Sequence, residues 1–212
     1  MTLILGRKRG MTQLFAEDGT VTGVTVVEAG PCVVTQVRNQ EQDGYHAIQL
    51  GFEDIADKRT PKPQLGQYKK VGCAPKRFQR EERLEKPAEH KVGETLACTI
   101  FKVGDVVDVV GTMKGRGFAG TIKRHGFQRG PETHGCMNVR QPGSLASRRI
   151  GKVVKGKRLG GHYGNSRHTS KNMVVVRIDA ERHLLYLKGS VAGPNNGFVQ
   201  VQRARTPKIK KG

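Results

Sequence analysis

Tryptophan is absent from this chain of 212 residues, and all aromatic residues together make up only 5% of it. No stretch approaches the roughly 18 consecutive apolar residues that a membrane-spanning helix needs. The four cysteines are scattered along the chain and form no C-x-x-C pair, which argues against a disulfide framework and favours a reducing compartment such as the cytoplasm. We therefore expect neither a membrane protein nor a disulfide-rich secreted domain.

Acidic residues are scarce in one region, and the positive charge is concentrated there. The chain carries 38 lysines and arginines against 18 aspartates and glutamates, a net charge of +20. Residues 1–111 are nearly neutral, whereas residues 112–171 contain 14 basic side chains and a single acid, Glu132. This local excess of one sign excludes an ordinary neutral enzyme surface and indicates a polyanionic partner.

The same basic segment has too few apolar residues to build a core of its own. Residues 112–171 contain 12 of the 28 glycines of the chain. A segment of this composition cannot bury enough apolar area to offset the entropy lost when its backbone is ordered. Two interpretations remain open: a disordered basic linker, or an arm that becomes ordered by lying against phosphate groups.

The rest of the chain is typical of short β-strands separated by glycine turns, such as Asp18-Gly19 and Asp43-Gly44. This pattern predicts a mainly β fold, a small barrel or sandwich. We expect strands at 94–101 and 105–110, and a late hairpin that joins 173–178 to 184–187. The expected organisation is a first part of the barrel at 1–52, an inserted α/β lobe at 53–94 with a short helix near 64–71, barrel strands at 95–111, a long irregular basic extension at 112–171, and closing barrel strands with a basic tail at 172–212.

Two motifs suggest cofactor chemistry, but neither has the required context. Residues 115–120 match G-x-G-x-x-G, yet only a short helix could follow at 121–125, and no acid occurs where a ribose would need one. His134 and Cys136 lack the second pair of ligands that a zinc site requires. The serines of the basic segment have no nearby carboxylate for nucleophilic catalysis. We therefore expect no cofactor, no metal, no small-molecule substrate and no catalytic residue.

The basic segment has the chemistry of an RNA-binding arm. Lysine supplies point charge, arginine can fork onto phosphate and stack on bases, and glycine lets the backbone approach phosphate closely. Phe118, Phe127, His162 and Tyr163 offer flat faces for unstacked bases. The candidate RNA-binding residues are Lys114, Arg116, Lys123, Arg124, His125, Arg129, His134, Arg140, Arg148, Arg149, Lys152, Lys155, Lys157, Arg158, His162 and Arg167.

Four stretches of the chain resemble the family of bacterial-type large-subunit ribosomal protein L3. They are residues 5–13 (LGRKRGMTQ), 111–125 (GTMKGRGFAGTIKRH), 151–165 (GKVVKGKRLGGHYGN) and 176–182 (VRIDAER). The stretches span nearly the whole chain in the order that the family shows. The second and third are long and unusual in composition, which makes the resemblance specific.

The resemblance implies a barrel related to those of translation proteins, and an extension that runs through large-subunit rRNA toward the peptidyl transferase centre. It implies a cytoplasmic ribosomal protein that binds this rRNA directly, contacts neighbouring large-subunit proteins and supports early subunit assembly without performing chemistry. The innermost part should lie near 143–150, with Gly143, Ser144, Ser147, Arg148 and Arg149 at the tip. The chain departs from the family at 145–150, where many bacterial members carry a methylated glutamine, so we do not expect that modification.

Two other classes of function remain open from the residues alone. A free-standing RNA chaperone or regulator would bind unrelated RNAs with similar affinity and would not accompany large ribosomal subunits. An RNA-modifying enzyme would need a pocket for a nucleotide or methyl donor, and no motif of the sequence predicts one.

Overall fold

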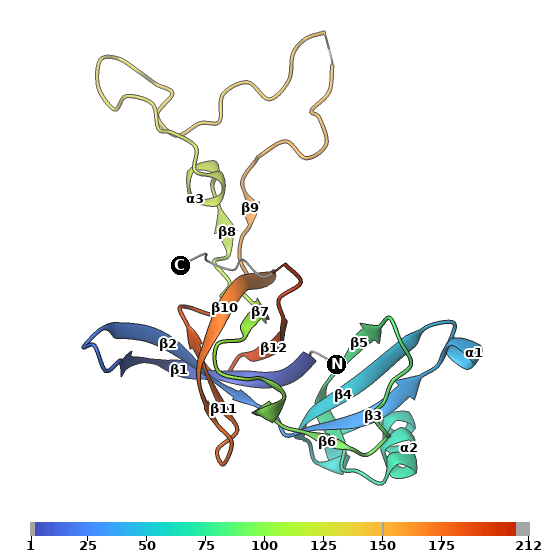
Figure 1. The fold of residues 1–212 in the computed structure, drawn as a ribbon. Helices are drawn as coiled ribbons and strands as arrows, with labels where there is room; N and C mark the ends of the chain where they lie inside the picture. Colours follow the sequence, from blue (N-terminus) through green and yellow to red (C-terminus); the bar gives the residue numbers. More distant parts are fainter. Residues whose placement is uncertain (1–2, 150, 207–212) are drawn as a thin grey trace. The chain divides into compact units, whose positions relative to one another are not determined.

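The computed structural model describes residues 3–149 and 151–206, and strands dominate it. Six of the described strands close into a barrel, in the order β1-β12-β7-β10-β11-β2 (Figure 1). They are β1 (Leu3–Phe15), β2 (Val21–Ala29), β7 (Val106–Thr112), β10 (Arg167–Asp179), β11 (Leu184–Lys188) and β12 (Phe198–Arg203). The closed barrel confirms the mainly β class.

Glycine turns and short connections set the pairing of neighbouring barrel strands. The β1–β2 hairpin turns at Asp18-Gly19, where the Asp18 carboxylate accepts a hydrogen bond of 2.9 Å from the Thr20 amide and Gly19 has a φ of 79°. Only a residue without a side chain adopts that φ at little cost. The late hairpin is also confirmed, because β10 pairs antiparallel with β11.

A second sheet accounts for residues that we expected in the barrel. Its order is β5-β4-β3-β6, built from β3 (Cys32–Arg38), β4 (His46–Asp54), β5 (Lys76–Leu84) and β6 (Thr95–Leu96). The strands β3 and β4 therefore leave the barrel, contrary to the placement of all of 1–52 in it. The chain changes sheets after Gly30-Pro31, where proline has no N–H to continue a strand ladder. Two helices accompany this sheet, α1 (Gln40–Asp43) and α2 (Lys62–Val71), and α2 confirms the helix expected near 64–71.

Two further strand boundaries differ from the expectation. The strand expected at 94–101 is only β6, because a 3₁₀ turn at Cys98–Ile100 follows it. Residues 167–171, expected in the basic segment, are instead the first part of β10, where Arg167 pairs with Thr112 of β7. Local composition cannot show this pairing, because the partner strand lies more than 50 residues earlier in the chain.

The barrel and the second sheet share one hydrophobic core. Ile4 and Leu5 of β1 and Leu185 of β11 are fully buried in the same cluster as Ile48 and Leu50 of β4. Fully burying a side chain of this size contributes about 1.5–3 kcal/mol. All members of the cluster come from residues 3–109 and 173–201. The core is therefore complete without any residue of the basic segment.

The chain divides into two compact units, Met1–Thr112 with Arg167–Gly212, and Met113–Ser166. We call the second unit the extension. It contains two short paired strands, β8 (Phe118–Ala119) and β9 (Gly161–His162), and one short helix, α3 (Thr121–His125). Ile150, the last residue of the expected tip, and the basic tail expected at 208–211 lie outside the described residues.

Candidate nucleic-acid interface

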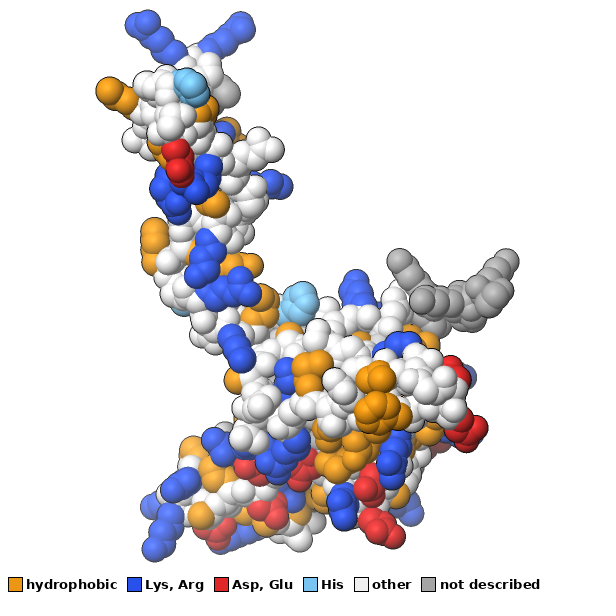
Figure 2. All heavy atoms as spheres, turned by 90° about the vertical axis from the view of Figure 1, so that its left-hand side faces the viewer, with side chains coloured by type: hydrophobic (Ala, Val, Ile, Leu, Met, Phe, Trp, Pro, Cys, Tyr) orange, Lys and Arg blue, Asp and Glu red, His pale blue; other side chains and the backbone are white. Residues whose placement is uncertain are grey.

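The extension carries twelve lysines and arginines and one acid, Glu132. Figure 2 shows its basic side chains along the whole length of this unit, with acidic atoms in one place. Glu132 forms an ion pair with Arg129. All the other cations of the extension lack a carboxylate partner among the described residues. Their charge is therefore available to an external anion.

The first and last segments of the extension are hydrogen-bonded to each other, and we call this paired part the neck. The Met113 amide donates to the Ser166 carbonyl over 2.9 Å, and the Arg116 amide donates to the Tyr163 carbonyl over 2.9 Å. The pairing of β8 with β9 continues this ladder. The Arg116 guanidinium lies over the Tyr163 ring, 5.0 Å from its centroid. Lys114, Arg116 and His162 are exposed on this neck, where their side chains can reach phosphate.

Helix α3 holds three of the candidate residues in different environments. It ends at Gly126, whose φ of 71° lets its amide donate back to the Ile122 carbonyl. Lys123 is exposed. Arg124 Nη1 donates to the Leu159 carbonyl over 2.9 Å, and His125 Nε2 lies 3.0 Å from the same oxygen. Arg124 and His125 therefore attach α3 to the segment that contains Leu159. Their position in a basic run of the sequence did not reveal this role.

Between α3 and Leu159 the backbone is irregular and its cations point outward. The Gly130 amide donates to the Val139 carbonyl over 3.0 Å, but residues 127–158 contain no helix or strand in the part that the structure describes. His134 adopts a φ of 60°. The exposed candidate residues of this stretch are Arg129, His134, Arg140, Arg148, Arg149, Lys152, Lys155, Lys157 and Arg158.

The residues expected at the tip form a tight polar turn. Ser144 Oγ donates to the Ala146 carbonyl over 3.1 Å, and Ser147 Oγ accepts a hydrogen bond of 3.4 Å from the Arg149 amide. The Ser147 carbonyl also accepts from the Gly151 amide. Arg148 is exposed on this turn, as is Gly143 before it. The serine side chains thus stabilise the turn of the backbone, while the exposed side chains of Arg148 and Arg149 can bind an external anion.

Arg167 is the one candidate that lies outside the extension. It is an exposed residue of β10 and lines a cavity of about 340 Å³ with Arg80 of β5 and Phe198 of β12. The Arg80 guanidinium lies 5.6 Å from the centroid of the Phe198 ring, and Phe198 stacks on Phe78 with centroids 4.3 Å apart. Arg80 is a further candidate RNA ligand that its sequence context does not indicate, because its neighbours in the chain include Glu81 and Glu82.

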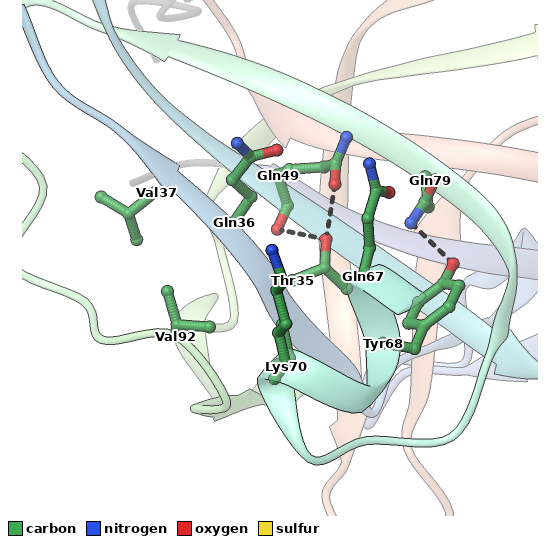
Figure 3. A pocket seen from close by; sticks show the side chains of 10 residues that line it. Thr35, Gln36, Val37, Gln49, Gln67, Tyr68, Lys70, Gln79 and Val92 are labelled. Carbon is green, nitrogen blue, oxygen red and sulfur yellow. Dashed lines mark hydrogen bonds between the residues drawn. The ribbon is translucent and has the colours of Figure 1, made fainter. Parts of the chain in front are cut away.

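A cavity of about 420 Å³ beside α2 lacks the groups that catalysis would need (Figure 3). Its walls are mostly amides and apolar side chains, and its ionisable lining groups are Lys70 and Tyr68. The Tyr68 hydroxyl donates to the Lys76 carbonyl over 3.1 Å and accepts from Gln79 Nε2 over 2.6 Å. Burial raises the pKa of Tyr68. The cavity therefore contains no nucleophile with an adjacent base.

Metal and membrane sites do not emerge from the described residues. His134 and Cys136 gain no third ligand there, and no three His, Cys, Asp or Glu side chains gather to hold a metal ion in residues 3–149 and 151–206. None of the helices in this part of the chain has the length and apolar character needed to span a membrane.

Helix α3 and the irregular stretch should differ in their resistance to protease. We expect trypsin to cut the isolated protein first after Arg140, Arg148 or Lys152, and at least about tenfold more slowly after Arg124. Opening the hydrogen-bonded α3 costs an additional free energy, and about 1.4 kcal/mol gives a factor of ten. A mass-spectrometric time course measures the order of cuts, with Lys69 in α2 as the helical control. Equal cutting rates after Arg124 and Arg140 would contradict the hydrogen-bonded α3 as described.

Comparison with known proteins places this arrangement in a family. Residues 79–184 match the family described as Ribosomal protein L3. A large ribosomal subunit protein uL3 of Pelotomaculum thermopropionicum is 50% identical over 201 residues, covering 95% of this chain and 96% of the relative. The uL3 of Geobacillus sp. (strain WCH70) is 51% identical over 207 residues, 98% of each chain. The uL3 of Syntrophobacter fumaroxidans is 47% identical over 206 residues, covering 97% of this chain and 98% of the relative.

These similarities extend over the barrel, the second sheet and the extension alike, because each covers at least 95% of the chain. They agree with the resemblance carried by the four sequence stretches, two of which (111–125 and 151–165) lie almost entirely within the extension. The chain therefore belongs to the ribosomal protein L3 family, whose members are structural constituents of the ribosome rather than enzymes.

Proposed function

We propose that the protein works in the large subunit of the cytoplasmic ribosome, where it binds large-subunit rRNA directly through the extension. The observation that carries this proposal is the set of exposed lysines and arginines of the extension, which, apart from Arg129, have no carboxylate partner among the described residues. Each cation that neutralises a phosphate releases condensed counterions, which favours binding. The barrel and second sheet supply a stable base because their core needs no residue of the extension.

The irregular backbone supports folded RNA as the partner. A regular duplex presents a uniform groove to a helix or a two-stranded ribbon, and residues 127–158 provide neither in their described part. Folded RNA instead offers loops, unstacked bases and grooves of varied width. Arg116 on Tyr163 and the exposed Phe118 add planar faces for such bases. The extension should therefore recognise RNA shape rather than a linear sequence.

The proposed role in the subunit is structural. A cationic segment that threads between rRNA helices lowers their mutual repulsion, so the protein should support early assembly of the subunit. The turn at Ser144–Ser147, with Arg148 and Arg149 beside it, is the part that we propose to reach toward the peptidyl transferase centre. The barrel surface is left to contact neighbouring proteins and peripheral rRNA.

Sedimentation distinguishes this function from that of a free-standing RNA chaperone. We expect a tagged full-length protein to accompany large subunits on a sucrose gradient in low salt, at about one copy per subunit. In the reconstitution of large subunits from their purified parts, omission of the protein should halt assembly at an early, slower-sedimenting particle. A chaperone would instead remain at the top of the gradient and bind unrelated RNAs with equal affinity.

A further inference from the structure

The β1–β2 hairpin continues beyond the barrel as a ribbon of only two strands (Figure 1). The pairing of β12 with β1 ends at Arg7, and the pairing of β11 with β2 begins at Val24. Residues 10–23, which we call the distal hairpin, therefore have no third strand among the described residues. An isolated two-stranded ribbon is at best marginally stable in water, so this segment gains from a partner that covers it.

One face of the distal hairpin carries three exposed apolar side chains. Alternation along β1 puts Met11, Gln13 and Phe15 on the same face, and Phe15 lies opposite Val21 in the register. The exposed fractions are 56% for Met11, 74% for Phe15 and 51% for Val21. Gly23, opposite Gln13, adds no side chain to this face and has open space above it. Single exposed apolar residues are ordinary, but a group on one face marks an interaction surface.

The charge of the distal hairpin argues against RNA as the molecule that covers it. No lysine or arginine occurs between Arg9 and Arg38, although the whole chain has a net charge of +20. Its turn carries Glu17 and Asp18, which have no ion-pair partner among the described residues. The Asp18 pKa is lowered by the hydrogen bond from the Thr20 amide, so this carboxylate stays ionised. Phosphate groups would be repelled at this turn.

The cations near the base of the distal hairpin do not change this balance. Arg9 is held by Glu28, with 2.5 Å between the guanidinium and the carboxylate. Lys188 lies on β11, opposite Val24. Both therefore lie at the barrel end of the ribbon, and the turn itself presents only negative charge.

We infer that the distal hairpin is a docking site for a basic neighbouring protein of the large subunit. This protein packs apolar side chains on Met11, Phe15 and Val21 and places lysine or arginine side chains against Glu17 and Asp18. The inference rests on the proposed place of the chain in the large subunit. It assigns opposite partners to two parts of one chain: the extension binds RNA, and the distal hairpin binds protein.

Photo-crosslinking inside assembled subunits tests this assignment. Phe15 is replaced by p-benzoylphenylalanine in the full-length protein, and a matched variant carries the same replacement at Phe118, which is 83% exposed in the extension. Large subunits are purified, irradiated and digested with either ribonuclease or protease. We expect the Phe15 variant to form an adduct with a different basic protein, and the Phe118 variant to form an adduct with rRNA.

Charge reversal tests the electrostatic part. The double change Glu17→Lys and Asp18→Lys should lower the yield of the Phe15 protein adduct at least threefold. The control reverses two exposed acids elsewhere, Glu41→Lys and Asp57→Lys, and should leave the yield unchanged. An equal fall of the Phe15 adduct yield in the two double variants would contradict a specific attraction between the partner and the acids of the turn.

The remaining outcomes are decisive. An adduct of the Phe15 variant with rRNA or with a second copy of the chain, or no adduct at all in purified large subunits, would overturn the inference and leave the proposed function standing. Absence of both variants from large subunits would instead overturn the proposed function, and the inference with it.

Discussion

Excision of residues 113–166 should flatten the salt dependence of rRNA binding by about 4–5 units of the log–log slope. The extension carries twelve lysines and arginines, and we expect half of them to contact phosphate. Each contact contributes about 0.7–0.9 to the slope, because it releases counterions from the RNA. The measurement is the affinity for large-subunit rRNA at a series of salt concentrations. A slope equal to that of the intact protein would contradict the extension as the RNA-binding element.

The structure shows where to close the chain in this variant. Thr112 of β7 lies opposite Arg167 of β10, so a two-residue Asn-Gly turn can join them as a tight hairpin. No residue of the hydrophobic core is lost, and the thermal unfolding midpoint should stay within a few degrees of that of the intact protein. This preserved midpoint separates a loss of RNA contacts from a loss of fold.

Two triple variants test whether the charge of the extension, rather than its length, determines the salt dependence of rRNA binding. Neutralising three exposed cations of the extension, with Lys152→Gln, Lys155→Gln and Lys157→Gln, should flatten the slope by about 1 unit, because half of the cations are again expected to contact phosphate. The matched control neutralises three exposed lysines of the second sheet's lobe, and should leave the slope unchanged. These control changes are Lys58→Gln, Lys62→Gln and Lys69→Gln.

Substitution of Gly6 by alanine should lower the free energy of unfolding by about 3 kcal/mol. Gly6 lies in β1, paired with Ala29, and a Cβ atom there would be 2.2 Å from the Glu28 carbonyl oxygen. The contact is with backbone, so β1 and β2 must separate to relieve it, and overpacking of this kind typically costs 1–3 kcal/mol or more. For a domain of this size the midpoint of thermal unfolding should fall by about 6–12 °C.

Gly10 in the same strand is the matched control for this change. A Cβ atom at Gly10 would meet nothing within 4 Å, and the residue does not have a positive φ. Gly10→Ala should therefore change stability by less than about 1 kcal/mol, and in the stabilising direction, because alanine restricts the unfolded chain. Equal midpoints for the two variants would show that the close approach of β1 to Glu28 is absent in solution.

Local features of the structure followed from short-range patterns in the sequence. The turn at Asp18-Gly19 and the late hairpin of β10 and β11 were confirmed. Helix α3 occupies 121–125, the segment before Gly126 in which the sequence left room for a short helix. In each case the signal and the structure that it causes lie within about 20 residues of each other, so no distant contact can override it.

Strand β5 shows why the second sheet was not foreseen. Its sequence, KRFQREERL, is rich in charge and lacks the apolar alternation of a half-buried strand. It forms because β4 offers a full edge for pairing, from His46 opposite Leu84 to Asp54 opposite Lys76. Its charged side chains find partners only after pairing, as with Lys76 and Asp54. A strand stabilised by its neighbour in this way is invisible to composition.

The candidate site was predicted as a set of residues but not as an arrangement. The run of exposed cations from Arg140 to Arg158 follows directly from composition, because the few apolar residues between them cannot build a core that would bury them. Arg124 and His125, in contrast, are indistinguishable in the sequence from the other basic residues. In the structure both side chains contact the Leu159 carbonyl. Arg167 belongs to a barrel strand, and Arg80 reaches the same cavity from β5.

The amino-acid sequence by itself determined the uneven charge, the glycine-rich extension and the mainly β character, because these depend on residue types and on spacings of a few positions. The tertiary structure alone decided which strands share a sheet, where the extension begins and ends, and which cations are already engaged. The physical reason is that strand partners and hydrogen-bond acceptors come from segments far apart in the chain. Their free energy is gained only when those segments meet.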